Sequence, residues 1–565
     1  IKKAIKKILF FKINLYKNMK ININLFPSEI KDTIKSYSFF KPKNKQELED
    51  AIMSLHKSKR NSIRKNGHIG NWDTSLINDM SYLFQDRKNF NFDISHWDVS
   101  NVRNMSGMFN RCENFNQPLN NWDVSNVCTM SGMFIGCKNF NQPLNKWDVS
   151  NVTDMSCMFY QCLSFNQPID KWIVSKVKFM KKLFYGCIKF DQYINSWDVS
   201  NVLNMDHMFF KCINFNQNLS SWNVSNVEYM SLIFAGCKVF NQNINTWKTE
   251  NLSELHNAFN SCLLFNQPLD KWIISKVKNL DAVFDGAKSF NQPLNNWDTS
   301  NVISMQNMFC DCENFNQPLD KWDISNVKNA AYIFKNTNYD FKLNWNIPIH
   351  DKYSLKYCVE ILYNKEQNYD TKYLKNNKKN IINIHGNIED WDVSNVKNMS
   401  ELFKNLSEFN EDISKWDVSN VEYMNYMFSG CSNFNQNIND WNMSNIGSAC
   451  HMFENCIKFN QPLNKWRLSS AYNLNSMFFN CENFNQNINS WTMSNVEYAE
   501  YMFENCKNFN QPLNNWKVSK IKVMKGMFSD CHNFNQDLSK WKTHNLRNMV
   551  ELFNNCKKFN QNINN

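Results

Sequence analysis

The sequence predicts an α/β repeat solenoid in which every 25-residue unit contributes one short parallel strand and one short helix or 3-10 turn. Three observations lead to this fold class. Tryptophans recur at a spacing of 25 residues, each unit repeats one apolar pattern, and a single unit is too small to bury that pattern alone. Eighteen of the 19 tryptophans follow the spacing, from Trp72 to Trp322 and from Trp391 to Trp541, and only Trp345 is out of register. We therefore expect about eighteen stacked units.

The strand is predicted around the tryptophan of each unit, which we number as position 1 of 25. Leu119, Trp122 and Val124 have the spacing L-x-x-W-x-V, which is that of a leucine-rich repeat with Trp in one Leu place. Residues two apart point to the same face of a strand, so Trp122 and Val124 are expected to face inward.

A short helix is predicted after the strand. Ser125 and Asn126 are favourable N-cap residues, and the next apolar residues recur at i, i+3, i+4 and i+7. These residues are Met130, Met133, Phe134 and Cys137. The core is therefore expected to contain Trp97, Trp122, Trp147, Trp172, Trp197, Trp222, Phe134, Phe140 and Cys137.

Two segments are predicted to cap apolar ends of the solenoid. Leu48, Ala51, Ile52 and Leu55 form a helical stripe before Trp72, and Leu355, Cys358, Val359 and Leu362 form a similar stripe before Trp391. The expected organisation is a basic segment at 1–39, a cap at 40–71, a first solenoid block at 72–346, an insertion or second cap at 347–390, and a second block at 391–565. The first segment is expected to be partly disordered or upstream of the true start, and the last block to be truncated.

Charge is concentrated near the start of the chain. Residues 1–70 carry a net charge of +12 and residues 71–565 carry −1. A nucleic-acid-binding array needs a basic stripe along its repeats, so we expect no nucleic acid on the solenoid. No apolar stretch is long enough to span a membrane, and no convincing secretory signal is visible. Localisation is left open, with the cytoplasm slightly favoured on these grounds.

The recurrent polar and sulfur residues receive structural interpretations. Fourteen of the 19 cysteines occupy position 16, which predicts a column of free buried thiols, with disulfides or a metal as alternatives. Asp at position 2, as in Asp123, is expected to accept hydrogen bonds from the Ser-Asn turn two residues on, with an acidic or calcium-binding stripe as the alternative. No catalytic motif appears, and we expect neither enzymatic activity nor a cofactor.

The repeat resembles a known family. Phe115–Cys137 reads FNQPLNNWDVSNVCTMSGMFIGC, and this pattern is similar to the BspA-like leucine-rich repeats of surface proteins. The preceding FKPKNKQELEDAI and GHIGNWDTS resemble the leader of that family. The resemblance implies an extended solenoid, often displayed on cell surfaces and associated with adhesion to proteins. The alternative is a ubiquitin-ligase adaptor, because LFPSEIKDTI at Leu25–Ile34 resembles the opening of an F-box.

A protein-binding face is predicted where the common Asp of position 2 is lost. Side chains at positions 25 and 2 alternate with the buried Trp and are expected to point outward. The candidate residues are Lys171, Ile173, Lys248, Lys271 and Ile273. Each Ile replaces an Asp without an evident repair elsewhere in its unit. The identity of the protein partner and the oligomeric state are not encoded in these patterns.

Overall fold

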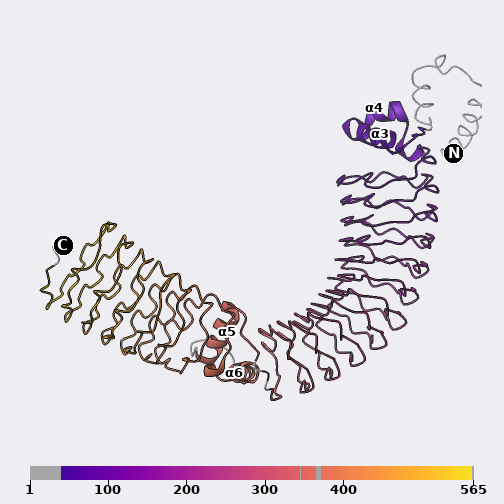
Figure 1. Ribbon diagram of the computed structural model, residues 1–565. Helices are drawn as coiled ribbons and strands as arrows, with labels where there is room; N and C mark the ends of the chain where they lie inside the picture. The colour runs from indigo at the N-terminus through magenta and orange to yellow at the C-terminus, as the bar shows by residue number, and fades with distance from the viewer. Residues whose placement is uncertain (1–39, 344, 346, 364–370, 563–565) are drawn as a thin grey trace, which may run out of the picture. The chain divides into compact units, whose positions relative to one another are not determined.

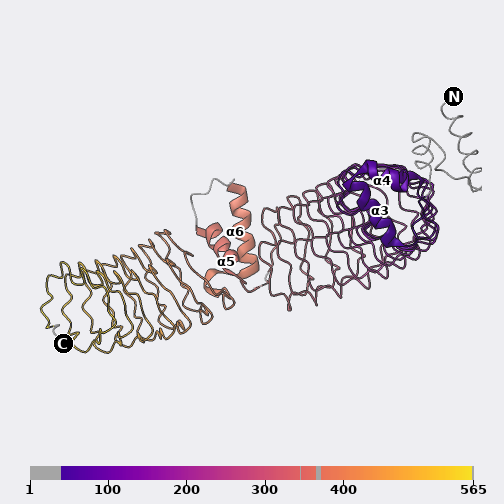
Figure 2. The same cartoon turned by 90° about the horizontal axis from the view of Figure 1, so that it is seen from above.

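The computed structural model describes residues 40–343, 345, 347–363 and 371–562. The chain divides into two compact units, which are residues 1–301 with 311–322 (unit 1) and residues 302–310 with 323–565 (unit 2). Within each unit the repeats form successive loops stacked in a row, as Figure 1 and Figure 2 show. The predicted block boundary between residues 346 and 347 lies inside unit 2.

A ladder of backbone hydrogen bonds joins each turn of the solenoid to the next. The N–H of Met130 donates to the carbonyl of Asp154 at 3.0 Å, and the N–H of Gly132 donates to that of Ser156 at 2.7 Å. Parallel bridges join residues at position 8 of successive turns, for example Thr129 and Asp154. Among the described residues these bridges stay isolated and do not extend into strands.

The strand predicted around each tryptophan is not formed. Trp122 N–H donates to the carbonyl of Leu119 at 3.0 Å, and Val127 N–H donates to that of Val124 at 2.9 Å. Both bonds close tight turns within the unit. The alternating apolar residues therefore face inward from turns, and the parallel pairing lies further along the unit at position 8.

The element predicted after the strand was a short helix or 3-10 turn. The described residues form tight turns there, such as the one closed by Met133 N–H and the carbonyl of Met130 at 3.1 Å, and not a helix. Gly132 and Gly136 have φ values of 64° and 67°, and many other turns hold non-glycine residues in this left-handed conformation. Two left-handed residues four positions apart, at positions 11 and 15 of the unit, turn the chain sharply, and N–H groups in this stretch donate to the next turn. Their cost of roughly 1 to 2 kcal/mol per non-glycine residue is offset by the ladder bonds they allow. Side chains in such turns recur at three and four residues, as they do in a helix.

The core consists of columns of side chains that run through the stacked turns. All nine predicted core residues are at most 3% exposed. The ring of Phe134 stacks between those of Phe109 and Phe159, at centroid distances of 5.5 and 5.7 Å. The indole N–H of most turns also has an acceptor in the preceding turn, as in Trp147, which donates to the carbonyl of Leu119 at 2.9 Å, whereas that of Trp72 in the first turn has none among the described residues. The tryptophan of most turns is thus buried with its N–H group hydrogen-bonded.

Unit 1 begins with a helical segment that covers the first turn. It comprises α3 (Lys45–Lys57), α4 (Lys59–Asn66) and the 3-10 helix η2 (Ile69–Asn71). Asn44 caps α3 by accepting a hydrogen bond from the N–H of Glu47 at 3.0 Å. The helix buries the four residues of the predicted stripe, which are Leu48, Ala51, Ile52 and Leu55. Figure 1 shows α3 and α4 at the start of the row of turns.

Unit 2 contains a second helical segment with the same order of elements. It comprises α5 (Lys352–Tyr363), α6 (Thr371–His385) and η3 (Ile388–Asp390). On one side, Ile347 N–H donates to Ile384 O at 2.9 Å. On the other side, Ile349 N–H donates to Asp392 O at 2.8 Å. The residues just before α5 are therefore bonded to α6 and to the turn that follows, and Asn383 Nδ2 of α6 donates to the carbonyl of Phe341 at 3.2 Å on the preceding side.

Candidate interaction surface

The five predicted surface residues all lie in unit 1 and are exposed, and they are Lys171, Ile173, Lys248, Lys271 and Ile273. The side chains at position 2 stand out most, because Ile173 is 60% exposed and Ile273 is 45% exposed. Position 2 lies between two buried residues, as in Trp172 and Val174. The alternation therefore directs it outward even though the segment is a turn.

The five residues form two patches. Thr249, which follows Lys248, hydrogen-bonds to both the backbone N–H and the carbonyl of Ile273, at 2.7 and 2.9 Å. Lys248, Lys271 and Ile273 are thus on adjacent turns. Two turns with Asp198 and Asn223 at position 2 separate Ile173 from Lys248. The structure therefore does not bring Ile173 together with Ile273.

Each isoleucine is accompanied by a lysine at position 5 that sequence reasoning missed. In common turns an Asn at this position donates to the preceding turn, as Asn126 Nδ2 does to Ser100 O at 2.8 Å. In the two isoleucine turns, Lys176 and Lys276 donate instead to Asn151 and Asn251, each at 2.7 Å. This lysine replaces the cross-turn contact of the Asn at position 5 and not the turn contacts of the lost Asp. The signal was visible in the sequence, which reads WIVSK and WIISK where common units read WDVSN.

The common Asp of position 2 makes the predicted turn contacts. Asp123 Oδ1 accepts hydrogen bonds from the N–H and the hydroxyl of Ser125, at 3.1 and 2.6 Å. In Asp148, hydrogen bonds from the side chain and then the backbone of Ser150 lower the pKa of the carboxyl. The carboxylate is therefore occupied by its own turn, which supports the structural interpretation of this column.

The thiols of position 16 are buried hydrogen-bond donors. Cys137 is fully buried, and its Sγ donates to the carbonyl of Phe109 in the preceding turn at 3.1 Å. Burial raises the pKa of the Cys112 thiol to about 12. The thiolate is the reactive form of cysteine, so this column is unsuited to nucleophilic chemistry. All 19 cysteines carry free thiols.

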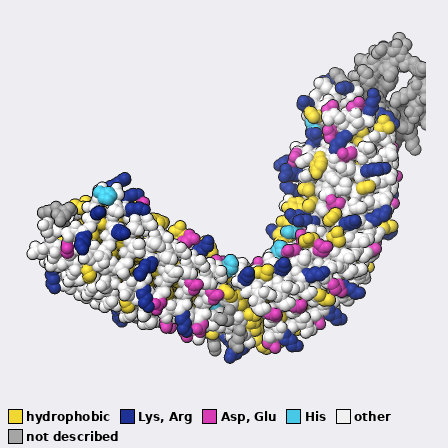
Figure 3. Space-filling view, viewed as in Figure 1, with side chains coloured by type: hydrophobic (Ala, Val, Ile, Leu, Met, Phe, Trp, Pro, Cys, Tyr) yellow, Lys and Arg dark blue, Asp and Glu magenta, His cyan; other side chains and the backbone are white. Residues whose placement is uncertain are grey.

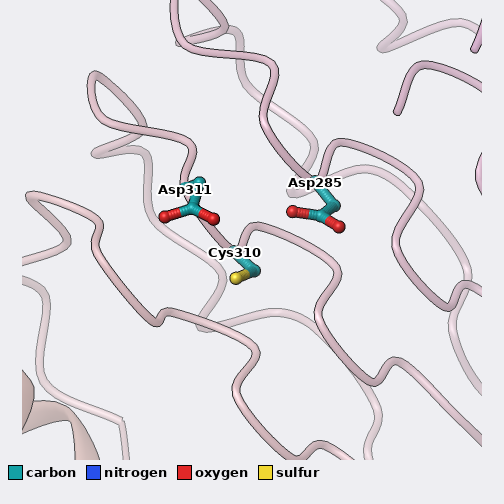
Figure 4. Close-up of side chains that lie close together, drawn as sticks. All are labelled: Asp285, Cys310 and Asp311. Carbon is teal, nitrogen blue, oxygen red and sulfur yellow. The ribbon is translucent and has the colours of Figure 1, made fainter. Parts of the chain in front are cut away.

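Two acidic features offer little for ligand binding. In unit 1 the carboxylates of Asp285 and Asp311 have oxygen atoms within 4.8 Å of each other (Figure 4). Asp285 also accepts a hydrogen bond from Asn260 at 3.1 Å. In unit 2 an open depression is lined by Glu389, Asp390, Trp391, Asp392 and Lys415, and Lys415 lies 3.6 Å from Asp390. Half-exposed acidic groups of this kind do not by themselves define a cation site.

Two expectations concern other parts of the chain. The F-box-like segment Leu25–Ile34 lies outside the described residues, so the adaptor hypothesis stays a prediction. Among the described residues, no helix combines the length and apolar character needed to cross a membrane.

The stacked 25-residue turns define a tandem-repeat protein with a solenoid fold. The chain belongs to the family described as "Mycoplasma protein of unknown function, DUF285", whose model matches residues 53–172, 154–272, 253–372, 372–491 and 472–565. No curated protein matches the chain. A leucine-rich-repeat protein of Leptospira interrogans is 10% identical over 89% of this chain and 95% of its own, with a TM-score of 0.18. So low a TM-score supports no argument about this chain.

Proposed function

We propose that the chain is a non-enzymatic scaffold that binds partner proteins through the outer surface of its turns. The observation that carries this proposal is the exposure of large apolar side chains on a molecule whose interior is already filled. Ile173 is 60% exposed and Ile273 is 45% exposed. Figure 3 shows hydrophobic and Lys or Arg side chains gathered along one margin of unit 1. Apolar residues rimmed by polar ones, as Ile273 is by Lys248 and Lys271, are typical of protein-binding surfaces.

Within this proposal we favour adhesion, in the manner of the BspA-like surface proteins. The support is the resemblance of Phe115–Cys137 to those repeats. We propose no enzymatic role, because the repeated polar side chains are engaged in turn contacts and the repeated thiols are buried. We also propose that the solenoid does not bind nucleic acid, since residues 71–565 carry a net charge of −1.

The proposal is tested by photo-crosslinking from Ile173 in the full chain, with the same crosslinker at Tyr193, at position 22 of the same turn, as a control. Tyr193 is 52% exposed, so both positions are accessible. We expect a protein crosslink from position 173 that excess unlabelled chain suppresses. The double variant Ile173→Asp with Ile273→Asp restores the common turn pattern. Added in excess as the unlabelled chain, it should suppress the crosslink much less than the parent chain does. The absence of any saturable protein crosslink from either position would refute the scaffold role.

A further inference from the structure

We propose that a second face of unit 1 binds an acidic segment of a partner protein that also carries aromatic or aliphatic side chains. The face is built around Tyr160, Tyr185 and Phe210, which we call the ring row. It rests on the proposed function, because it assigns a partner chemistry to a protein-binding solenoid. It differs from the predicted face, since the ring row occupies position 14 and the isoleucines occupy position 2.

The ring row is a stack of three aromatic side chains on consecutive turns. The centroids of Tyr160 and Tyr185 are 4.4 Å apart with an interplanar angle of 17°. Those of Tyr185 and Phe210 are 4.5 Å apart with an angle of 22°. All three side chains are half-buried. The flanking turns carry Ile135 and Ala235 at the same position, so the stack is confined to these three turns.

This stacking leaves the edge of the Tyr185 ring, and not its faces, for a partner. Both faces of Tyr185 are covered by its two neighbours, at 4.4 and 4.5 Å. An aromatic ring is electron-rich on its faces and electron-poor at its edge. A row of ring edges therefore attracts carboxylate oxygens in the ring plane and accepts aromatic or aliphatic groups in edge contacts. Nucleic-acid bases need an open ring face for stacking, which Tyr185 does not offer.

Positive charge surrounds the ring row. Residues 153–161, 178–186 and 203–211, which hold positions 7 to 15 of the three turns, include four lysines and two aspartates. Lys181 lies 3.8 Å from Asp206, and the ammonium of Lys211 lies 5.2 Å from the Phe210 ring centroid. Lys178 and Lys182 make no ion pair with the described residues. Unpaired ammonium groups beside apolar edges favour a partner with carboxylates.

Two further side chains lie near the ring row: Phe179 adds apolar surface, and His207 adds a polar imidazole. Phe179 is 43% exposed on the same turn as Tyr185. Nδ1 of His207 is buried without a described hydrogen-bond partner, and the ring centroid of His207 lies 6.3 Å from that of Tyr185. Burial, and then the charge of Lys182, lower the pKa of His207. The imidazole is therefore held neutral, and the positive charge of the face comes from its lysines.

The test measures binding of a fluorescent peptide of alternating Glu and Phe to the full chain. Lys182→Glu and Tyr185→Leu change the face. The fold should tolerate both, because Glu401 occupies the left-handed position of Lys182 in another turn with φ of 62°, and Ile135 occupies the position of Tyr185. The matched controls are Lys176→Glu and Tyr193→Leu, which lie at positions 5 and 22 of the same turn, outside positions 7 to 15.

We expect the peptide to bind, and each face variant to weaken binding about tenfold, as the loss of one charge-assisted or aromatic contact predicts. The two control variants should bind as the parent chain does. The inference is overturned if all variants bind equally, or if Lys176→Glu weakens binding as much as Lys182→Glu. It is also overturned if a Glu-Gly peptide or single-stranded DNA binds as tightly. Failure here, with crosslinking from position 173 intact, would leave the scaffold role standing.

Discussion

Trp222→Ala provides a direct test of the interior columns in unit 1. Trp222 is 3% exposed, and its indole lies between those of Trp197 and Trp247, at centroid distances of 6.5 and 6.2 Å. Its Nε1 donates to the carbonyl of Ile194 at 3.0 Å. The substitution therefore removes two stacking contacts, one hydrogen bond and the volume of the indole at a single site.

The magnitude follows from these contacts. A buried tryptophan removes about 200 Å² from water, and at about 25 cal/mol per Å² this gives about 5 kcal/mol. Part of that area stays covered after truncation, and the lost hydrogen bond adds about 1 kcal/mol. We expect the free energy of unfolding to fall by about 4 to 5 kcal/mol, within the range for such truncations. Because turns contact only their neighbours, the loss should be local.

Hydrogen exchange read by mass spectrometry measures both the size and the extent of this effect. Amides in the turns next to residue 222 should lose protection, while those near Trp97 should keep it. Trp222→Phe should cost about 1 kcal/mol for the lost hydrogen bond, because the carbonyl of Ile194 keeps the N–H of Trp197 as a donor at 3.1 Å. Trp72→Phe is the matched control, since the Trp72 indole N–H has no described acceptor. Unchanged protection in Trp222→Ala, or an equal loss throughout unit 1, would refute the reasoning.

Three further predictions concern the thiols, the aspartates and the second helical segment. In native protein a thiol reagent should modify Cys128, which is exposed, while Cys137 reacts only after denaturation, and rapid native labelling of Cys137 would contradict its burial. Since the folded pKa of Asp148 is lowered, its contribution to stability is present above about pH 4 and is lost as pH falls, so Asp148→Asn should flatten the acid end of the stability curve. A chain that starts at Pro348 keeps α5 packed on the core of the turn at Trp391 and should be soluble and cooperative, whereas one that starts at Trp391 should aggregate, and sedimentation that fails to distinguish the two would remove the capping role.

The repeat period and the core could be predicted from the sequence because buried positions hold apolar residue types, and these types are visible in the sequence. The inward residues Trp122, Phe134 and Cys137 recur in nearly every unit, and the same interior selects them each time. The helix α3 could be predicted equally well, because the spacing that places Leu48 and Leu55 on one face fits few structures other than a helix.

The backbone of each turn could not be predicted in the same way. A spacing of three and four residues arises from an α-helix and from tight turns with two left-handed residues four positions apart. The decisive feature is the backbone of Gly132 and Gly136, and other turns place Cys157 and Gln161 there, so glycine does not mark these positions reliably.

The outer surface was the hardest part to predict, because it depends on neighbouring turns. The contact that Lys176 makes is with Asn151 in the preceding turn, 25 residues away. The ring row likewise forms only because Tyr160, Tyr185 and Phe210 occupy one position on three consecutive turns.

The backbone ladder also determines which changes of length the protein can absorb. Each turn makes the same set of hydrogen bonds with the turn after it as with the turn before it, as Thr129 does in its bridges to Asn104 and Asp154. Duplication or deletion of a whole turn leaves every donor opposite an acceptor. Insertion of one residue between Met130 and Gly136 shifts each later donor against its acceptor and moves the left-handed residues out of place. Related proteins should therefore differ by whole turns. The length of the solenoid then changes by one turn at a time, while the side chains of the interior stay the same.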